Sequence, residues 1–276
     1  MLFSRSLDVD GSSVWYDSTP PASQPIIFVH GGFGSSSDLW HLTMQNLPRG
    51  AAGYAINNFL RSDPPPNGYS VSSFADRLAH FADALALDLP VIVGHSMGGV
   101  VCQLAAIRYP DRFGGMVLVG TGPSMRNHRV GQQLLDRLRT DGFTLDLMRE
   151  VSAYWFHQSP PGGFFDAYVA RAMMAPLNAM IDVQASLLET DLVKELGRIT
   201  CPTLIVHGAH DVGRPIEHAN ALQSGIAGSR LHVCTESGHS PMLETPGDFD
   251  AAFHDFLKSL QSSPRNAHSG SATERT

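Results

Sequence analysis

Six short apolar runs recur along the chain, and they limit its possible folds more than any other feature. They read PIIFV (25–29), GYAIN (53–57), LPVIV (89–93), GMVLV (115–119), PTLIV (202–206) and LHVC (231–234). They are rich in β-branched residues and bounded by glycine, proline or polar residues, which predicts strands. Because the apolar residues are continuous rather than alternating, both faces of each strand should be buried, as is typical of a parallel sheet.

Amphipathic helical patterns lie between several of these runs. One follows Ser72 or Ser73, the expected N-cap, and another lies near the carboxyl end. Their apolar residues recur at helical spacing: Phe74, Leu78, Phe81 and Leu85 in the first, and Phe249, Phe253, Phe256 and Leu260 in the second. Strands that alternate with helices are joined by right-handed crossovers, so we predict an α/β fold, a three-layer sandwich with a mostly parallel sheet between helices. The segment SSVWY (12–16) is expected to add an antiparallel edge strand.

The alternation breaks once, between about residues 122 and 197, where helical runs such as GQQLLDRLRT follow one another without a convincing strand. We therefore predict a core built from residues 1–121 and 198–260 and a helical cap over residues 122–197. The tail 261–276, QSSPRNAHSGSATERT, is polar and almost free of large apolar residues, so we expect it to be disordered.

Composition excludes several classes of partner. The formal net charge is −7, and the 19 basic residues form no run, so the basic stripe of a nucleic-acid-binding protein is missing. The amino-terminal MLFSRSLDVDG lacks the apolar core of a signal peptide, and no run of about 18 apolar residues occurs. We expect a cytoplasmic monomer or homodimer that binds neither nucleic acid nor membrane and acts on a small molecule.

The three cysteines are far apart and lack paired spacing. Cys102, Cys201 and Cys234 therefore predict neither a disulfide framework nor a zinc site, and we expect them to be reduced and mostly buried. No metal ligand set is expected elsewhere.

The stretch VIVGHSMGGVV (91–101) carries the strongest chemical signal. It places Ser96 between a predicted strand and a predicted helix, with Gly94 and Gly98 two residues away on either side. A tight strand-to-helix turn strains the backbone of the serine and leaves no room for neighbouring side chains, which explains the G-x-S-x-G pattern. Such a turn exposes the hydroxyl as a nucleophile and directs the N–H of Met97 towards an oxyanion.

A serine nucleophile needs a base, and the base needs an orienting acid. Asp211 lies in HGAHDVGRP, just after the strand PTLIV, and His239 lies in TESGHSPMLETP, just after the strand LHVC. Both residues therefore follow strand ends at the edge of the sheet where Ser96 is expected. The chain order Ser96, Asp211, His239 is the order expected for this kind of sheet.

Other residues compete for these roles. Glu236 and Asp191 are possible acids in poorer positions, whereas the strand GMVLV is followed by GTGPS, without an acid. Asp211 and His239 could also be simple turn residues. Among the 13 histidines, His207 and His210 are expected to shape the Asp211 loop, and His41, His80, His218 and His254 to lie on helix surfaces.

The loop HGGFGSSSDLW, after the strand IIFV, is expected to supply a second oxyanion donor. Its consecutive glycines let the backbone approach a reacting carbonyl closely. Gly32 is the first choice for the donating N–H and Phe33 the second, while His30 is expected to brace the loop. A glycine-rich loop could instead hold phosphate, but no G-K-S/T or G-x-G-x-x-G pattern follows.

The predicted cap concentrates aromatic residues and methionines in AYWFHQSPPGGFF and ARAMMAPLNAMI. Flat rings and flexible thioethers suit an apolar pocket of adaptable shape, although they could equally pack the cap onto the sheet. The residues expected to contact substrate are His95, Met125, Trp155, Phe156 and Met173.

Taken together, HGGFGSSSDLW, GHSMGG, HGAHD and SGHSPMLETP resemble the α/β-hydrolase superfamily across about residues 12–260. The resemblance implies a sheet of about eight strands with a helical cap. It also implies that Ser96 is the nucleophile, Asp211 the acid and His239 the base, with an oxyanion hole at Gly32 and Met97. One segment departs from the family pattern: INNFLRSDPPPNGYS stands where many members carry Asp-x-x-Gly-x-Gly-x-Ser.

Family comparisons also narrow the chemistry. Dehalogenases and epoxide hydrolases use an aspartate nucleophile, and prolyl peptidases tend to have tryptophan after the serine, where this chain has Met97. Many carbon–carbon hydrolases carry motifs similar to G-N-S-M-G-G at the nucleophile and G-H-W at the base. In this chain His95 precedes the serine in place of asparagine, and Ser240 follows His239 in place of tryptophan. Perhydrolases and cofactor-free haloperoxidases usually show G-x-S-T-G-G.

The expected activity is therefore cofactor-free hydrolysis of a carboxylic ester or lactone of a small, largely apolar substrate. Carbon–carbon hydrolysis and perhydrolase or haloperoxidase chemistry remain alternatives. A non-catalytic ligand-binding protein of the same fold is a further one.

Overall fold

The computed structural model describes residues 1–33, 36–158 and 163–262. The predicted disorder of the tail from residue 263 onward lies outside these residues, as do Gly34 and Ser35 of the glycine-rich loop and residues 159–162 of the aromatic-rich segment.

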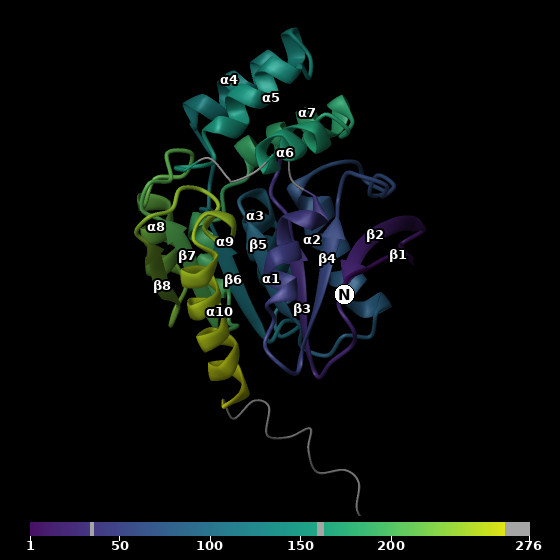
Figure 1. Cartoon of the computed structure of the whole chain (residues 1–276), viewed down its shortest axis with the longest axis vertical. Coiled ribbons are helices and arrows are strands. Elements are labelled where there is room, and N and C mark those ends of the chain that lie inside the picture. Colours follow the sequence, from purple (N-terminus) through teal and green to yellow (C-terminus); the bar gives the residue numbers. More distant parts are fainter. Residues whose placement is uncertain (34–35, 159–162, 263–276) are drawn as a thin grey trace, which may run out of the picture.

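A single eight-stranded sheet runs through the molecule in the order β1-β2-β4-β3-β5-β6-β7-β8 (Figure 1). Strand β2 pairs antiparallel with β1 and with β4, and the remaining neighbours pair in parallel. The strands are β1 (Phe3–Val9), β2 (Ser12–Ser18), β3 (Gln24–Val29), β4 (Ala51–Asn57), β5 (Val91–His95), β6 (Gly115–Val119), β7 (Thr203–Gly208) and β8 (Arg230–Cys234). The predicted fold class and all six predicted parallel strands are confirmed.

The antiparallel edge differs from the prediction, because β2 is the second strand and β1 forms the edge. Strand β1 was not predicted, since most of its residues are exposed and it has no apolar run. The signal that could have found it is the Asp10–Gly11 pair, whose φ values of 55° and 77° make the tight hairpin turn between the two strands.

Helices cover both faces of the sheet, as the continuous apolar strands require. On one face, side chains such as Ile27, Ile92 and Leu118 pack against α2, α3 and α8. On the other face, alternate residues such as Phe28 and Val93 pack against η1, α1 and α10. These elements are η1 (Ser37–Trp40), α1 (His41–Gln45), α2 (Val71–Ala84), α3 (Met97–Arg108), α8 (Glu217–Gly225), α9 (Pro241–Glu244) and α10 (Pro246–Gln261).

The N-cap of α2 corrects one detail of the sequence analysis. The helix begins at Val71, and the side chain of Ser70, not of Ser72 or Ser73, accepts a hydrogen bond from the N–H of Ser73 at 3.0 Å. Four successive residues offered three possible caps, and the apolar spacing alone could not choose among them.

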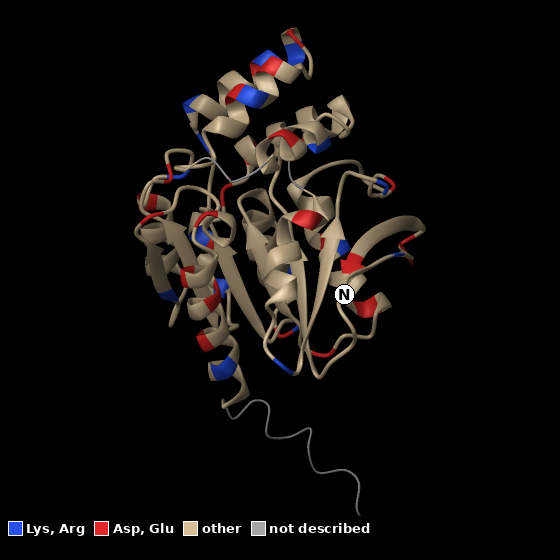
Figure 2. Cartoon of the chain, in the orientation of Figure 1, with Lys and Arg blue, Asp and Glu red and all other residues tan. Residues whose placement is uncertain are grey.

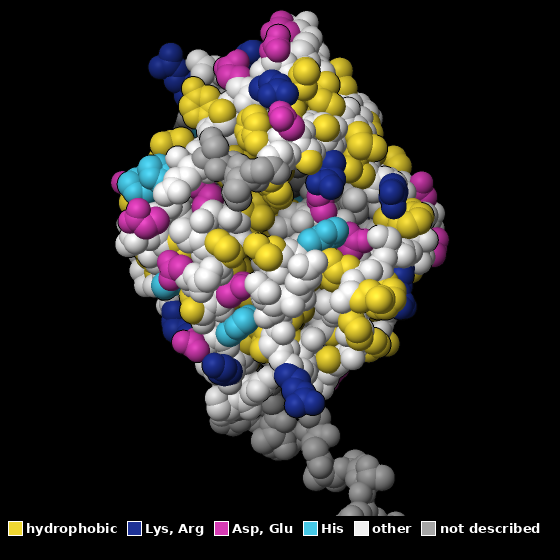
Figure 3. Space-filling view, viewed as in Figure 1, with side chains coloured by type: hydrophobic (Ala, Val, Ile, Leu, Met, Phe, Trp, Pro, Cys, Tyr) yellow, Lys and Arg dark blue, Asp and Glu magenta, His cyan; other side chains and the backbone are white. Residues whose placement is uncertain are grey.

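Four helices between β6 and β7 lie together above the sheet (Figure 1). They are α4 (Arg129–Thr140), α5 (Leu145–Ala153), α6 (Phe164–Ala172) and α7 (Leu177–Glu189), followed by η2 (Val193–Arg198). Hydrophobic side chains gather on the surface over these helices (Figure 3), where Val130, Leu145, Tyr154, Met174 and Leu177 are exposed. This helical insertion faces the residues that follow β3, β5, β7 and β8 across a cavity.

Charged residues are dispersed over the molecule. Basic and acidic residues are interspersed along α4 and α5 and around the sheet (Figure 2), consistent with the dispersed charge of the sequence. Among the described residues, no helix combines the length and the apolar character needed to cross a bilayer.

Candidate active site

Ser96 occupies the turn between β5 and α3 with φ 53° and ψ −116°, a left-handed conformation that costs strain in a residue other than glycine. Its flanking glycines are steric requirements. A Cβ on Gly94 would lie 2.3 Å from the carbonyl oxygen of Gly98, and a Cβ on Gly98 would lie 2.3 Å from that of Val29. The turn is further held by the Ser96 N–H, which donates to the carbonyl of Val119 at 2.9 Å.

The loop after β3 approaches the nucleophile turn closely. A Cβ on Gly32 would lie 3.9 Å from the Cβ of Met97, so the backbones of the two expected oxyanion donors are neighbours. Ser96, Met97, Gly32 and Phe33 all line the same cavity. Tyr168 on α6 donates a hydrogen bond to the carbonyl of Phe33 at 2.9 Å, which connects the helical insertion to this loop.

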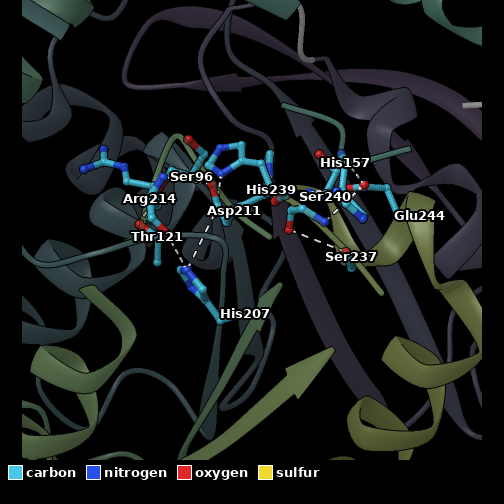
Figure 4. A network of polar contacts seen from close by, with 12 residues as sticks. Ser96, Thr121, His157, His207, Asp211, Arg214, Ser237, His239, Ser240 and Glu244 are labelled. Atoms are coloured by element: carbon cyan, nitrogen blue, oxygen red, sulfur yellow. Dashed lines mark hydrogen bonds and ion pairs between the residues drawn. The ribbon is translucent and has the colours of Figure 1, made fainter. Parts of the chain in front are cut away.

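His239 and Asp211, brought by the loops after β8 and β7, form a direct hydrogen bond. The distance from His239 Nδ1 to Asp211 Oδ2 is 2.8 Å, so Nδ1–H donates to the carboxylate and Nε2 is left to accept a proton. The carboxylate also accepts the backbone N–H of Arg214 on Oδ1 at 2.8 Å. Figure 4 shows the side chain of Ser96 beside the imidazole of His239.

Electrostatics keep the carboxylate of Asp211 ionised. Burial alone would raise its pKa, but attraction to His239, their hydrogen bond, attraction to His207 and the N–H of Arg214 outweigh burial and lower the pKa below its ordinary value. His207 Nε2 lies 3.7 Å from Asp211 Oδ2 and 2.6 Å from the carbonyl of Arg214, so His207 shapes this loop, as the sequence suggested. A charged acid next to the imidazole is what a histidine base requires.

His95 is a correction to the predicted substrate contacts. It is buried, its Nε2–H donates to the carbonyl of His239 at 3.0 Å, and it does not line the cavity. Burial and the neighbouring His239 lower the pKa of His95 to about 3, so the ring is neutral. It therefore supports the backbone of His239 rather than a substrate.

The cavity next to Ser96 has a volume of about 600 Å³. Of the other predicted contacts, Met125 and Trp155 line it, but Phe156 and Met173 do not. Phe156 packs against Phe164, Phe165 and Tyr168 within the insertion, and Met173 packs against the core cluster. Phe156 and Met173 therefore pack against other side chains of the protein, which was the alternative to a substrate contact.

The competing residues lie elsewhere. Asp191 forms an ion pair with Arg126 at 3.5 Å and a β-bridge with Ser124, and Glu236 is exposed. His30 has the expected bracing geometry: its Nδ1–H donates to the carbonyl of Gly31 at 2.7 Å, and its Nε2 accepts the N–H of Asn58 at 2.9 Å. Burial lowers its pKa to about 4, so it stays neutral.

Within the described part of the chain, one group of side chains could hold a metal ion. It consists of His232, Cys234 and Asp248, whose ligand atoms lie within 4.8 Å of one another. None of the three lines the cavity, and His232 Nε2 is already hydrogen-bonded to Asp248 at 2.8 Å.

Glu244 is a site residue that sequence reasoning missed. Its carboxylate accepts the backbone N–H groups of Gly238 at 3.1 Å and Ser240 at 3.0 Å, which flank His239. It also accepts those of His157 at 2.7 Å and Gln158 at 3.3 Å, in the helical insertion (Figure 4). One carboxylate therefore fixes the histidine loop and connects it to the helices above. The signal was its place five residues after His239, in HSPMLE.

Replacing Glu244 with alanine should destabilise the protein by about 1–3 kcal/mol, because several N–H groups lose their acceptor. It should also lower kcat by about tenfold while changing KM less, since the loop that positions His239 loosens. Urea unfolding and ester kinetics measure the two effects. Glu236→Ala, at an exposed site in the same loop, is the matched control, and equal unfolding free energies for the two variants would contradict the prediction.

Comparisons with known proteins place this geometry in a family. The alpha/beta hydrolase fold model matches residues 24–246. A 2-hydroxy-6-oxo-6-phenylhexa-2,4-dienoate hydrolase from Comamonas testosteroni is 28% identical over 255 residues, covering 85% of this chain and 88% of that protein. A 2-hydroxy-6-oxo-2,4-heptadienoate hydrolase from Pseudomonas putida is 30% identical over 258 residues, covering 86% and 90%. The structure of an esterase from Exiguobacterium antarcticum matches with a TM-score of 0.83 at 22% identity, covering 91% of this chain and 97% of that chain. The resemblance drawn from the four motifs is thus confirmed, and the chain belongs to the α/β-hydrolase fold family.

Proposed function

We propose that this protein is a serine hydrolase that cleaves a carboxylic ester or lactone of a small, largely apolar substrate through an acyl-enzyme. Ser96 is the nucleophile, His239 the general base and Asp211 the orienting acid. The backbone N–H groups of Met97 and of Gly32, with Phe33 as the alternative, form the oxyanion hole.

The reaction follows from these positions. His239 Nε2 takes the proton of the Ser96 hydroxyl as the oxygen attacks the carbonyl carbon, and Asp211 stabilises the imidazolium through Nδ1. The oxyanion hole holds the negative oxygen, and each such donor is typically worth about 10²- to 10³-fold in kcat. His239 then protonates the leaving alcohol, and water repeats the sequence on the acyl-enzyme. All of these steps use side chains and backbone groups of this chain alone.

One observation carries the proposal. His239, hydrogen-bonded to the buried Asp211 at 2.8 Å, lines the cavity that Ser96 also lines. The same cavity is lined by apolar side chains such as Phe33, Leu147 and Trp155, which suit the apolar part of an acyl or alcohol group.

Hydrolysis of a carbon–carbon bond is the second candidate function, and the names of the two dienoate hydrolases among the relatives favour it. Two residues of this chain favour ester chemistry over it. His95 precedes the nucleophile where the G-N-S-M-G-G motif of carbon–carbon hydrolases has asparagine. Ser240 follows His239 where their G-H-W motif has tryptophan.

A side-by-side substrate screen tests the choice. We expect steady release of 4-nitrophenol from short-chain 4-nitrophenyl esters, or opening of lactones, with kcat/KM above that for vinylogous 1,5-diketones. Turnover of the diketones alone would replace the proposal with carbon–carbon hydrolysis. A protein that binds these compounds without turning any of them over would instead be a ligand-binding member of the fold.

A further inference from the structure

A buried arginine lines the cavity beside Ser96. Arg214 is 4% exposed and lies three residues after Asp211 in the loop that follows β7. Its backbone N–H is used to hold the Asp211 carboxylate, so the loop is fixed independently of the side chain. Figure 4 shows that side chain pointing away from the His239–Asp211 pair. The guanidinium group is therefore available for another purpose.

The side chain of Arg214 has few hydrogen-bond partners within the described part of the protein. Its side-chain hydrogen bond there is a long one, 3.5 Å from Nη1 to the carbonyl of Ser124, and no described carboxylate forms an ion pair with it. Asp211 attracts the guanidinium, but its oxygens are hydrogen-bonded to His239 and to the backbone of Arg214. A guanidinium has five N–H donors, and a buried charge is costly unless it is paired.

Several arginines on the surface, by contrast, form ion pairs. Arg108 pairs with Asp76 at 2.8 Å, and Arg137, at the edge of the cavity, pairs with Glu150 at 2.8 Å. These exposed side chains could remain solvated without a partner, yet they have one. Arg77, which is as buried as Arg214, has no ion pair either, but its Nη2 donates to the carbonyl of Asp63 at 2.7 Å, a much shorter bond than the 3.5 Å one of Arg214.

The histidines around Arg214 add no further positive charge. Burial, with a contribution from the cation of Arg214, lowers the pKa of His128, His207 and His218, so these rings are neutral near pH 7. Burial also lowers the pKa of Arg214, to about 10, which still leaves it protonated at neutral pH. Arg214 therefore brings a positive charge to this end of the cavity, partly balanced by the ionised Asp211 behind it.

The cavity thus has two chemically different sides. Arg214 and His128 line it together with Gln184, whose side-chain amide donates to the carbonyl of Gly131 at 2.9 Å. Apolar residues line most of the remainder, including Phe33, Leu134, Leu147 and Trp155, with the exposed Gln133, Asp136 and the Arg137–Glu150 ion pair at its edge. A ligand that fits both sides has an apolar body and one anionic group.

We propose that Arg214 is a specificity-determining residue that binds a carboxylate of the substrate, so that the preferred ester or lactone also carries a free carboxylate group. A guanidinium binds the planar carboxylate with two parallel N–H···O bonds, which fixes the orientation of the substrate as well as adding affinity. This inference rests on the proposed function, since it assigns the substrate class of the Ser96 site.

Matched ester pairs test the assignment. On the acyl side, each pair is a 4-nitrophenyl half-ester of adipate, suberate or sebacate and the same compound with its free carboxylate masked as a methyl ester. On the alcohol side, the pair is 4-acetoxybenzoate and its methyl ester. The wild-type protein should prefer the carboxylate member of at least one pair by about tenfold in kcat/KM, the effect of one charge-assisted bond.

Arg214→Gln should lower kcat/KM for that carboxylate ester by at least about 30-fold, the usual effect of truncating a buried, hydrogen-bonded charge pair. It should change kcat/KM for the masked ester by less than about threefold, and Arg214→Lys should fall between the wild type and the glutamine variant. Arg126→Gln removes the same charge from an exposed site nearby and should leave the preference unchanged. Circular dichroism checks that each variant is folded.

Each result decides the inference. Equal losses for both members of a pair in Arg214→Gln would show a purely structural arginine and overturn it. Absence of a carboxylate preference in the wild type, in every pair, would also overturn it, even if no Arg214 variant folds. Both of these outcomes leave the hydrolase proposal intact, whereas failure to hydrolyse any member of any pair would count against the proposed function itself.

Discussion

Ser96→Ala is expected to lower kcat for ester hydrolysis by about 10⁶-fold, the loss typical of removing the serine of such a triad. It should also abolish covalent labelling by a fluorophosphonate, because the hydroxyl oxygen that forms the bond is gone. Alanine keeps the same backbone strain as serine at φ 53°, and the flanking glycines are unchanged, so the fold should survive. Initial-rate kinetics and intact-protein mass spectrometry measure the two losses.

Ser224→Ala, on the exposed side of α8, is the matched control and should keep full rate and labelling. If the Ser96→Ala protein, shown by circular dichroism to be folded, still hydrolysed esters at an appreciable fraction of the wild-type rate, the covalent mechanism would have to be abandoned. Labelling that persisted in this variant would point to a different nucleophile.

The sequence predicted the sheet and the triad positions because both depend on local rules. Continuous β-branched runs specify strands buried on both faces, and strand ends carry the chemistry in parallel sheets. The G-x-S-x-G pattern indicated a tight turn because only glycine fits beside the serine, and a Cβ on Gly94 or Gly98 would indeed clash with a backbone carbonyl. Strand β1 was not predicted, because an exposed edge strand needs no apolar pattern.

The walls of the cavity were less predictable, because they depend on which way each side chain faces. His95 is adjacent to Ser96, but successive side chains at the end of a strand point in opposite directions. His95 is therefore hydrogen-bonded to the backbone carbonyl of His239 instead of lining the cavity. Phe156 and Met173 have the composition of pocket residues, but the rotation of a helix about its own axis decides between pocket and core. The roles of Arg214 and Glu244 could not be predicted from the sequence, because they depend on hydrogen-bond partners in three dimensions. Arg214 has few such partners, and Glu244 accepts from several backbone N–H groups.

Asp211→Asn is expected to cause the second large loss of kcat. The asparagine amide can donate to His239 Nδ1, which would place the ring proton on Nε2, the nitrogen that must accept the proton of Ser96. A wrong tautomer of this kind costs about 10⁴-fold in kcat. Burial and geometry should change little, because the side chain has the same size and its oxygen can still accept the N–H of Arg214, now bonded at 2.8 Å.

The loss should be in kcat rather than KM, since the cavity that binds the substrate is unaltered, and fluorophosphonate labelling should slow in parallel with turnover. Asp191→Asn is the informative control, because Asp191 was, with Glu236, one of the two other acids that the sequence allowed. It should cost less than about twofold, as expected for an ion pair near the surface. A large loss in Asp191→Asn together with near-normal turnover in Asp211→Asn would transfer the orienting role to Asp191. Because His239 Nδ1 lies 2.8 Å from Asp211 and Asp191 is engaged with Arg126, we expect the opposite result.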